Sequence, residues 1–173
     1  MSQFNGDDQD FKYDLDSIID LVQVDQLKAT FFEEAHSILS DLEDLIGQLE
    51  KNPHDFEITQ TLFRKIHTLK GNVGAIPGGQ MVGSIAHEFE AVLGKIKDAG
   101  VQVNDQLIDI FFKSSRILSN LINSLKEQRE LYPEELSEAI ELISEYGALS
   151  YQSRDLRIVH RSDKREANSP QQH

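Results

Sequence analysis

The sequence predicts an all-α protein, an antiparallel up-and-down four-helix bundle with an additional C-terminal helix. Two observations carry this prediction. In four successive segments, apolar residues recur every three or four positions, which is the spacing of a helix with one buried face. The connections between these segments are short and contain proline, glycine or asparagine. Helices with narrow apolar stripes and short connections bury those stripes best in an antiparallel bundle.

The segment before the bundle, residues 1–24, is acidic. Its first half is polar and is expected to be disordered, whereas regularly spaced apolar residues in its second half predict a short amphipathic helix. The bundle should occupy residues 25–130. Its first helix is expected to run from about Asp25 to Lys51, because the Asn-Pro pair that follows ends a helix.

The other three bundle helices are predicted from their end signals. Asp55 is a good N-cap for the second helix, which should stop at the Ile-Pro-Gly-Gly turn of residues 76–79. The third helix is expected over about residues 80–98 with its end at Gly100, and Asn104 caps the fourth.

A further helix is predicted after the bundle, within residues 131–148. Pro133 suits a first helical position, and the two glutamates after it interact favourably with the helix dipole. Gly147 is expected to end this helix. Residues 149–173 contain few apolar side chains and mixed charge, so we expect a linker or a disordered tail there.

The composition restricts the classes of function. No stretch approaches 18 apolar residues and the first ten residues are polar, so neither a transmembrane helix nor a signal peptide is expected. The chain has no cysteine, which excludes disulfides and thiolate metal sites and fits a reducing cytoplasm, where we expect the protein to act. A net charge of -13 opposes binding to nucleic acid and to anionic membranes.

The second predicted helix carries an unusual outward face. Its apolar stripe is made of Ile58, Leu62, Ile66, Leu69 and Val73. His67 lies nearly opposite that stripe, and Gly71 and Gly74 return to the same outward face. A glycine inside a helix costs roughly 1 kcal/mol relative to alanine, so two of them beside one histidine require a reason. We interpret them as clearance, because a surface without Cβ atoms lets another protein approach the imidazole.

Lys70 lies one helical turn after His67 and is therefore its neighbour on the helix surface. A phosphoryl group on the ring would carry close to two negative charges, and an adjacent ammonium would stabilise it. The pattern therefore favours His67 as a phosphoryl acceptor. Phe63, one turn before His67, is expected to be exposed and to lie within the footprint of a protein partner.

A histidine and a glutamate of the third helix are expected to lie near His67. Counting outward from the predicted turn sets position 67 level with about position 88, and His87 and Glu90 flank that level. A nucleophilic imidazole must be neutral, with one nitrogen protonated and the other offering a lone pair. Glu90 could fix that tautomer by accepting a hydrogen bond. His87 could either contact the phosphoryl group or tune the network.

These segments resemble a histidine-containing phosphotransfer (HPt) domain of the kind found at the N-terminus of chemotaxis histidine kinases of the CheA type. The similarity covers about residues 25–130 and is carried by FFEEAHSILSDLEDLIGQLE, FRKIHTLKGNVGAI and HEFEAVL. It implies that His67 is the phosphorylated residue and that Lys70, His87 and Glu90 belong to its active network. It also implies that the chain is either a stand-alone protein or part of a larger sensor kinase.

The sequence offers no glycine-rich phosphate loop and no nucleotide-binding pattern, so we expect no cofactor bound by this chain. ATP and Mg²⁺ are expected on partner domains. The phosphoryl group should arrive from a histidine kinase catalytic domain and leave to an aspartate of a response-regulator receiver domain.

Two other classes of function were weighed. A di-metal carboxylate bundle needs inward-facing Glu-x-x-His motifs, whereas this chain has the reversed order from His87 to Glu90 on an outward face. A non-catalytic helical adaptor, in which His67 is inert, is the second alternative.

Overall fold

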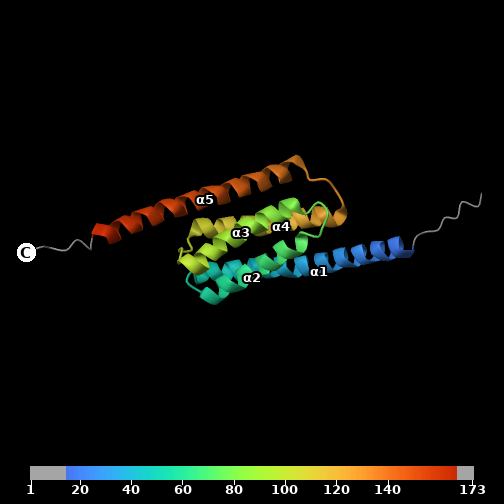
Figure 1. Cartoon of the computed structure of the whole chain (residues 1–173), viewed down its shortest axis with the longest axis horizontal. Coiled ribbons are helices and arrows are strands. Elements are labelled where there is room, and N and C mark those ends of the chain that lie inside the picture. Colours follow the sequence, from blue (N-terminus) through green and yellow to red (C-terminus); the bar gives the residue numbers. More distant parts are fainter. Residues whose placement is uncertain (1–14, 167–173) are drawn as a thin grey trace, which may run out of the picture.

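The structure, a computed structural model, describes residues 15–166, and the side chains of residues 19–98 and 100–149. In this part of the chain it contains five α-helices and no strand (Figure 1). They are α1 (Leu15–Lys51), α2 (Phe56–Val73), α3 (Gln80–Ala99), α4 (Asp105–Glu127) and α5 (Pro133–Glu166).

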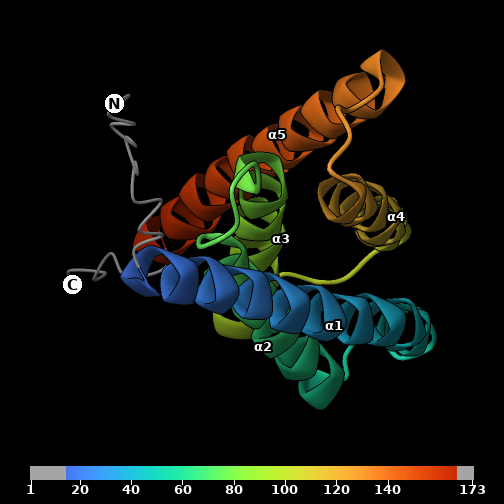
Figure 2. The ribbon, with the colours of Figure 1, turned by 90° about the vertical axis from the view of Figure 1, so that its right-hand side faces the viewer.

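Helices α1 to α4 form an up-and-down bundle in which each helix packs against the next and α4 returns to pack against α1 (Figure 2). Helix α5 lies outside this ring and contacts α3 and α4. The predicted fold class is therefore confirmed. None of the helices between residues 15 and 166 has both the length and the apolarity that a membrane span requires.

The helix ends confirm the capping residues read from the sequence. The Asp55 carboxylate accepts hydrogen bonds from the backbone N–H groups of Glu57 and Ile58, at 3.0 and 3.1 Å. Asn104 accepts one from the N–H of Leu107 at 2.9 Å. Gly100 ends α3 in the left-handed conformation, with φ of 64°.

The turn between α2 and α3 depends on two glycines. Gly78 has a φ of 83°, which L side chains rarely adopt. A Cβ at Gly79 would lie 2.6 Å from Val73 Cγ2 and 2.9 Å from the Val73 carbonyl oxygen. Because backbone atoms cannot easily move away, this position has no room for a side chain. The turn therefore holds α3 close to the end of α2.

The core runs along the axis of the bundle and extends under α5. The rings of Phe89 on α3 and Phe111 on α4 stack with centroids 4.7 Å apart. Helix α5 buries Tyr146 completely against them, and its hydroxyl lies 2.6 Å from Ser114 Oγ. Thus α5 supports the side of α3 and α4 that the ring of four helices leaves open.

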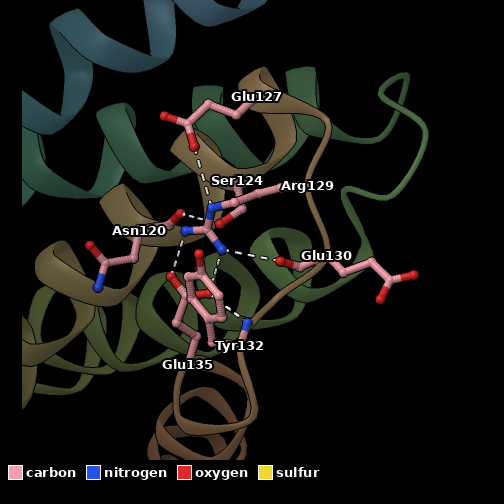
Figure 3. Close-up of polar contacts among 7 residues, drawn as sticks. All are labelled: Asn120, Ser124, Glu127, Arg129, Glu130, Tyr132 and Glu135. Carbon is pink, nitrogen blue, oxygen red and sulfur yellow. Dashed lines mark hydrogen bonds and ion pairs between the residues drawn. The ribbon is translucent and has the colours of Figure 1, made fainter.

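Arg129 joins the end of α4 to the start of α5 (Figure 3). Its guanidinium donates two hydrogen bonds of 2.7 Å to the two carboxylate oxygens of Glu135, and it lies 4.6 Å from the centre of the Tyr132 ring. These bonds lower the pKa of Glu135 to about 2, although partial burial opposes the shift. The connection is therefore fixed by a paired charge.

Two predicted helix ends differ from the structure. The expected short N-terminal helix and the first bundle helix form the single helix α1, since no glycine or proline interrupts them. Helix α5 also continues through Gly147 to Glu166, so the predicted helix end was wrong, and residues 149–166 of the predicted tail are helical. One glycine costs a helix only about 1 kcal/mol and need not end it. Residues 1–14 and 167–173 of the predicted terminal segments lie outside the described residues.

Candidate functional site

His67 lies on the outward face of α2, as predicted. Its side chain is 63% exposed, while Ile66 and Leu69 on the opposite face are buried. An imidazole in this position adds little to the core and is open to a second protein.

Glu90 reaches His67 from the neighbouring helix α3. Its Oε1 atom lies 3.0 Å from Nδ1 of His67, and its side chain is only 13% exposed. A carboxylate can only accept a hydrogen bond here, so Nδ1 carries the ring proton and is the hydrogen-bond donor. The other nitrogen, Nε2, is left with an outward-facing lone pair.

Lys70 completes a chain of three charged or polar groups. Its Nζ atom lies 2.5 Å from Oε2 of Glu90. Oε2 is buried and accepts no well-directed hydrogen bond within the described part of the chain, so this contact is chiefly an attraction between charges. Burial alone would raise the pKa of Glu90, but Lys70 and His67 outweigh it and lower the pKa. The carboxylate is therefore ionised at neutral pH.

Phe63 is half-buried, so the prediction that it is exposed was wrong. Its ring lies nearly parallel to the imidazole of His67, with 6.2 Å between centroids and 12° between planes. The ammonium of Lys97 lies 5.0 Å from the centre of the Phe63 ring. Phe63 lies against Gly94 of α3, where an added Cβ would be in ordinary van der Waals contact with the ring at 3.6 Å.

His87 stands apart from this group. It is exposed and makes no hydrogen bond or ion pair with any residue that the structure describes. The hairpin places it level with Lys70 rather than with His67, since His67 pairs with Glu90 and each step along α2 is matched by a reverse step along α3. Three of the four predicted network residues therefore meet, and His87 does not.

Gly71 and Gly74 leave the surface beside His67 open. Both are exposed, a Cβ at Gly71 would meet nothing within 4 Å, and one at Gly74 would touch only the Gly71 carbonyl oxygen at 3.5 Å. Close packing against another helix of the bundle therefore does not explain either glycine.

Gly94 and Lys97 were missed by sequence reasoning. The register that pairs His67 with Glu90 also sets Phe63 level with Gly94. The same hairpin count, corrected by two residues, would therefore have predicted the contact between Phe63 and Gly94. The contact of Lys97 depends on a flexible side chain and has no comparable signal in the sequence.

The site is an open surface. His67 lines neither of two pockets of about 170 and 230 Å³ in the described part of the chain. Among the side chains of residues 19–98 and 100–149, no three from His, Cys, Asp or Glu are grouped in a way that could hold a metal ion. The site therefore offers one nucleophile and its supporting groups.

Comparison with known proteins identifies the family of this chain. Residues 26–145 match the model of the Hpt domain family. The chain belongs to the Hpt family. This match includes the whole His67, Lys70 and Glu90 group and the first part of α5.

Individual relatives of this Hpt domain are chemotaxis proteins. The "Chemotaxis protein CheA" of Listeria monocytogenes is 33% identical over 96 residues, which is 56% of this chain and 15% of that protein. The CheA phosphotransferase domain from Thermotoga maritima has a TM-score of 0.53 at 28% identity, covering 59% of this chain and 95% of that domain.

A third relative shows the same fold at lower identity. It is the phosphorylated P1 domain of CheA3 in complex with CheY6 from R. sphaeroides, with a TM-score of 0.61 at 23% identity. The comparison covers 72% of this chain and 98% of that domain. The chain thus spans nearly the full length of these solved domains, but only about 15% of the length of the curated Listeria relative.

Proposed function

We propose that this chain carries phosphoryl groups on His67 in two-component chemotaxis signalling. The observation that supports this most directly is the pairing of an exposed imidazole with a mostly buried, ionised carboxylate at its Nδ1 atom. This arrangement holds the imidazole in the tautomer whose lone pair faces solvent. The outcome is a preorganised nucleophile.

In the proposed reaction, Nε2 of His67 attacks the terminal phosphorus of ATP, which a separate histidine kinase catalytic domain holds together with Mg²⁺. The N–P bond forms while the bond from phosphorus to the ADP oxygen breaks. The ring then gains positive character, which the carboxylate of Glu90 stabilises through the Nδ1 proton. Lys70 adds a positive charge near the incoming phosphoryl group.

The second step transfers the phosphoryl group from His67 to the receiver domain. A carboxylate oxygen of an aspartate on a response-regulator receiver domain attacks the phosphorus, the O–P bond forms, and the N–P bond breaks. The electron pair of that bond returns to Nε2, so the neutral imidazole is restored with its proton still on Nδ1. In this proposal ATP and Mg²⁺ are bound by the partner domains, and the exchange takes place in the cytoplasm, where those partners would act.

His67→Gln tests this proposal. Incubation with a cognate kinase catalytic domain and labelled ATP should give an acid-labile, base-stable adduct on the natural chain and none above background on the variant. The fold should persist because the side chain is exposed. His36→Gln is the matched control, since His36 is exposed on α1. Undiminished labelling of His67→Gln would show that another residue carries the phosphoryl group, and no labelling of the natural chain would favour an adaptor.

A further inference from the structure

The N-terminal part of α1 projects beyond the other helices of the bundle (Figure 1). We call residues 15–30 the overhang. Every residue from Ile19 to Leu27 is exposed, and Phe31 is the first buried residue of the helix. At 1.5 Å per residue the overhang is about 24 Å long. A helix of this length with no partner is only marginally stable in water.

The overhang is nevertheless rich in large apolar side chains. The described residues include nine exposed large hydrophobic side chains, and five belong to the overhang: Ile19, Leu21, Val22, Val24 and Leu27, each 45 to 65% exposed. Such a concentration on the surface of a water-exposed helix marks an interaction site. The family match begins at residue 26, so four of these five side chains lie before the matched part of the chain.

One face of the overhang continues the core stripe of the bundle. Leu21, Val24 and Leu27 precede the buried Phe31 in steps of three and four residues, so they lie in line with it on one side of the helix. Inside the bundle this line is covered by α2 and α4, and along the overhang nothing in the described chain covers it.

We propose that the occupant of this face is the overhang of a second copy, bound in antiparallel orientation about Val24. In that register Val24 lies against its own counterpart and Leu21 lies against Leu27 of the other copy. Position 31 falls opposite position 17, close to the start of α1, so the two overhangs match in length. The contact is the same on both copies and closes with twofold symmetry.

The charges of the overhang select this orientation. In the antiparallel register Asp20 of each copy lies opposite Lys28 of the other, which gives two symmetric attractive pairs. A parallel pair in register would place Asp20 beside Asp20 and Lys28 beside Lys28. Among the side chains of residues 19–98 and 100–149, neither Asp20 nor Lys28 has an ion-pair partner, so both are available for this contact.

Sedimentation equilibrium of the whole chain tests the association. The average mass should rise with concentration from 19.6 kDa toward twice that value. Leu21→Ser/Leu27→Ser should weaken dimerisation by more than about 100-fold, because four leucines lose their contact. The matched control is Ile19→Ser/Val22→Ser, which changes the opposite face and should leave the dimer intact. A monomer at all concentrations would overturn the proposal, as would a dimer sensitive only to the control pair.

Charge reversal tests the orientation. Asp20→Lys and Lys28→Asp should each weaken the dimer, and the two changes together should restore it. Failure of the double variant to recover would exclude the antiparallel register. The chain has no cysteine, so Val24→Cys introduces a single thiol. A short bis-maleimide should link two Val24→Cys chains efficiently and two Val22→Cys chains poorly, and the reverse result would also contradict the register.

Discussion

At the scale of single residues, Glu90 performs two tasks with its two oxygens. Oε1 accepts a hydrogen bond from the Nδ1–H group of His67, and Oε2 faces the ammonium of Lys70. The pKa of the carboxyl is lowered, so these contacts add stability above its unfolded value of 4.5 and lose it as pH falls through the lower folded value. Near neutral pH the group is always charged when it faces the imidazole.

Glu90→Gln should slow phosphoryl transfer by about 10- to 100-fold, by analogy with the loss of a carboxylate that orients a metal-bound histidine. The amide keeps the size of the side chain but loses the attraction to Lys70, so the melting temperature should fall modestly while the fold persists. Nitrogen NMR of the His67 ring should show a mixture of tautomers in place of one. Wild-type transfer with a single unchanged tautomer would show that Glu90 does not orient the ring.

Much of this residue-scale arrangement could be predicted from the sequence, because it depends on helix periodicity and on counting from a turn. His67, Lys70 and Glu90 were placed correctly on that basis. The half-burial of Phe63 was not predicted, since it depends on contacts with another helix, including Gly94 of α3. The level of His87 was predicted two residues off, since the hairpin register pairs position 67 with position 90.

At the scale of elements, helix starts were predictable because an N-cap acts on its own first turn, as Asp55 and Asn104 do. The lengths of α1 and α5 could not be predicted in this way. A glycine or a polar stretch ends a helix only if a non-helical conformation has the lower free energy. That free-energy difference depends on contacts elsewhere in the fold as well as on the local sequence. Tyr146, the residue directly before Gly147, is buried and holds α5 against the bundle. The sequence pattern around Tyr146 did not predict this burial.

Tyr146 makes the docking of α5 sensitive to alkaline pH. Burial raises the pKa of its phenol, and although the bond to Ser114 opposes this, the shift remains large. The phenol is neutral in the folded chain but ionises above about pH 10 in the unfolded chain. Stability is therefore complete below that pH and is lost as pH rises toward the folded value.

Tyr146→Phe should cost about 1 kcal/mol at pH 8, because the hydrogen bond to Ser114 is removed. Its free energy of unfolding should then decline less steeply than that of the natural chain between pH 10 and pH 11. Urea unfolding followed by circular dichroism measures the free energy of unfolding at pH 8 and its decline between pH 10 and pH 11. Tyr132→Phe, at an exposed ring, should follow the natural chain. Parallel curves for all three proteins would mean that Tyr146 does not control the alkaline response.

At the scale of the whole molecule, charge is unevenly distributed. The chain has a net charge of -13, yet residues 56–99 hold five Lys or Arg against four Asp or Glu. The hairpin that carries His67 is thus close to neutral within a strongly acidic protein. A partner that presents carboxylates is repelled least when it approaches this side.

Access to His67 can be tested with its two neighbouring glycines. Gly71→Leu should raise the stability of α2 by up to about 1 kcal/mol through helix propensity, whereas Gly74 is the C-cap residue after α2 and Gly74→Leu should leave the stability nearly unchanged. They should also slow transfer to a receiver domain by about 10-fold or more, because they place bulk beside the imidazole. Stopped-flow transfer and thermal unfolding are measured on the same samples.

Gly47→Leu is the control, since Gly47 is on α1 and an added Cβ there also meets nothing within 4 Å. It should raise stability without changing transfer. Normal transfer in the Gly71 and Gly74 variants would show that the open surface is not needed.

The uninterrupted course of α1 has a consequence for how related chains can diverge. Because the exposed overhang and the buried stripe share one helix, the direction of the overhang face depends on the number of residues between them. Losing one residue there would rotate the face by about 100° relative to the bundle, whereas losing seven would rotate it by only about 20°. Insertions and deletions in this helix should therefore survive in multiples near seven wherever the orientation of that face is under selection.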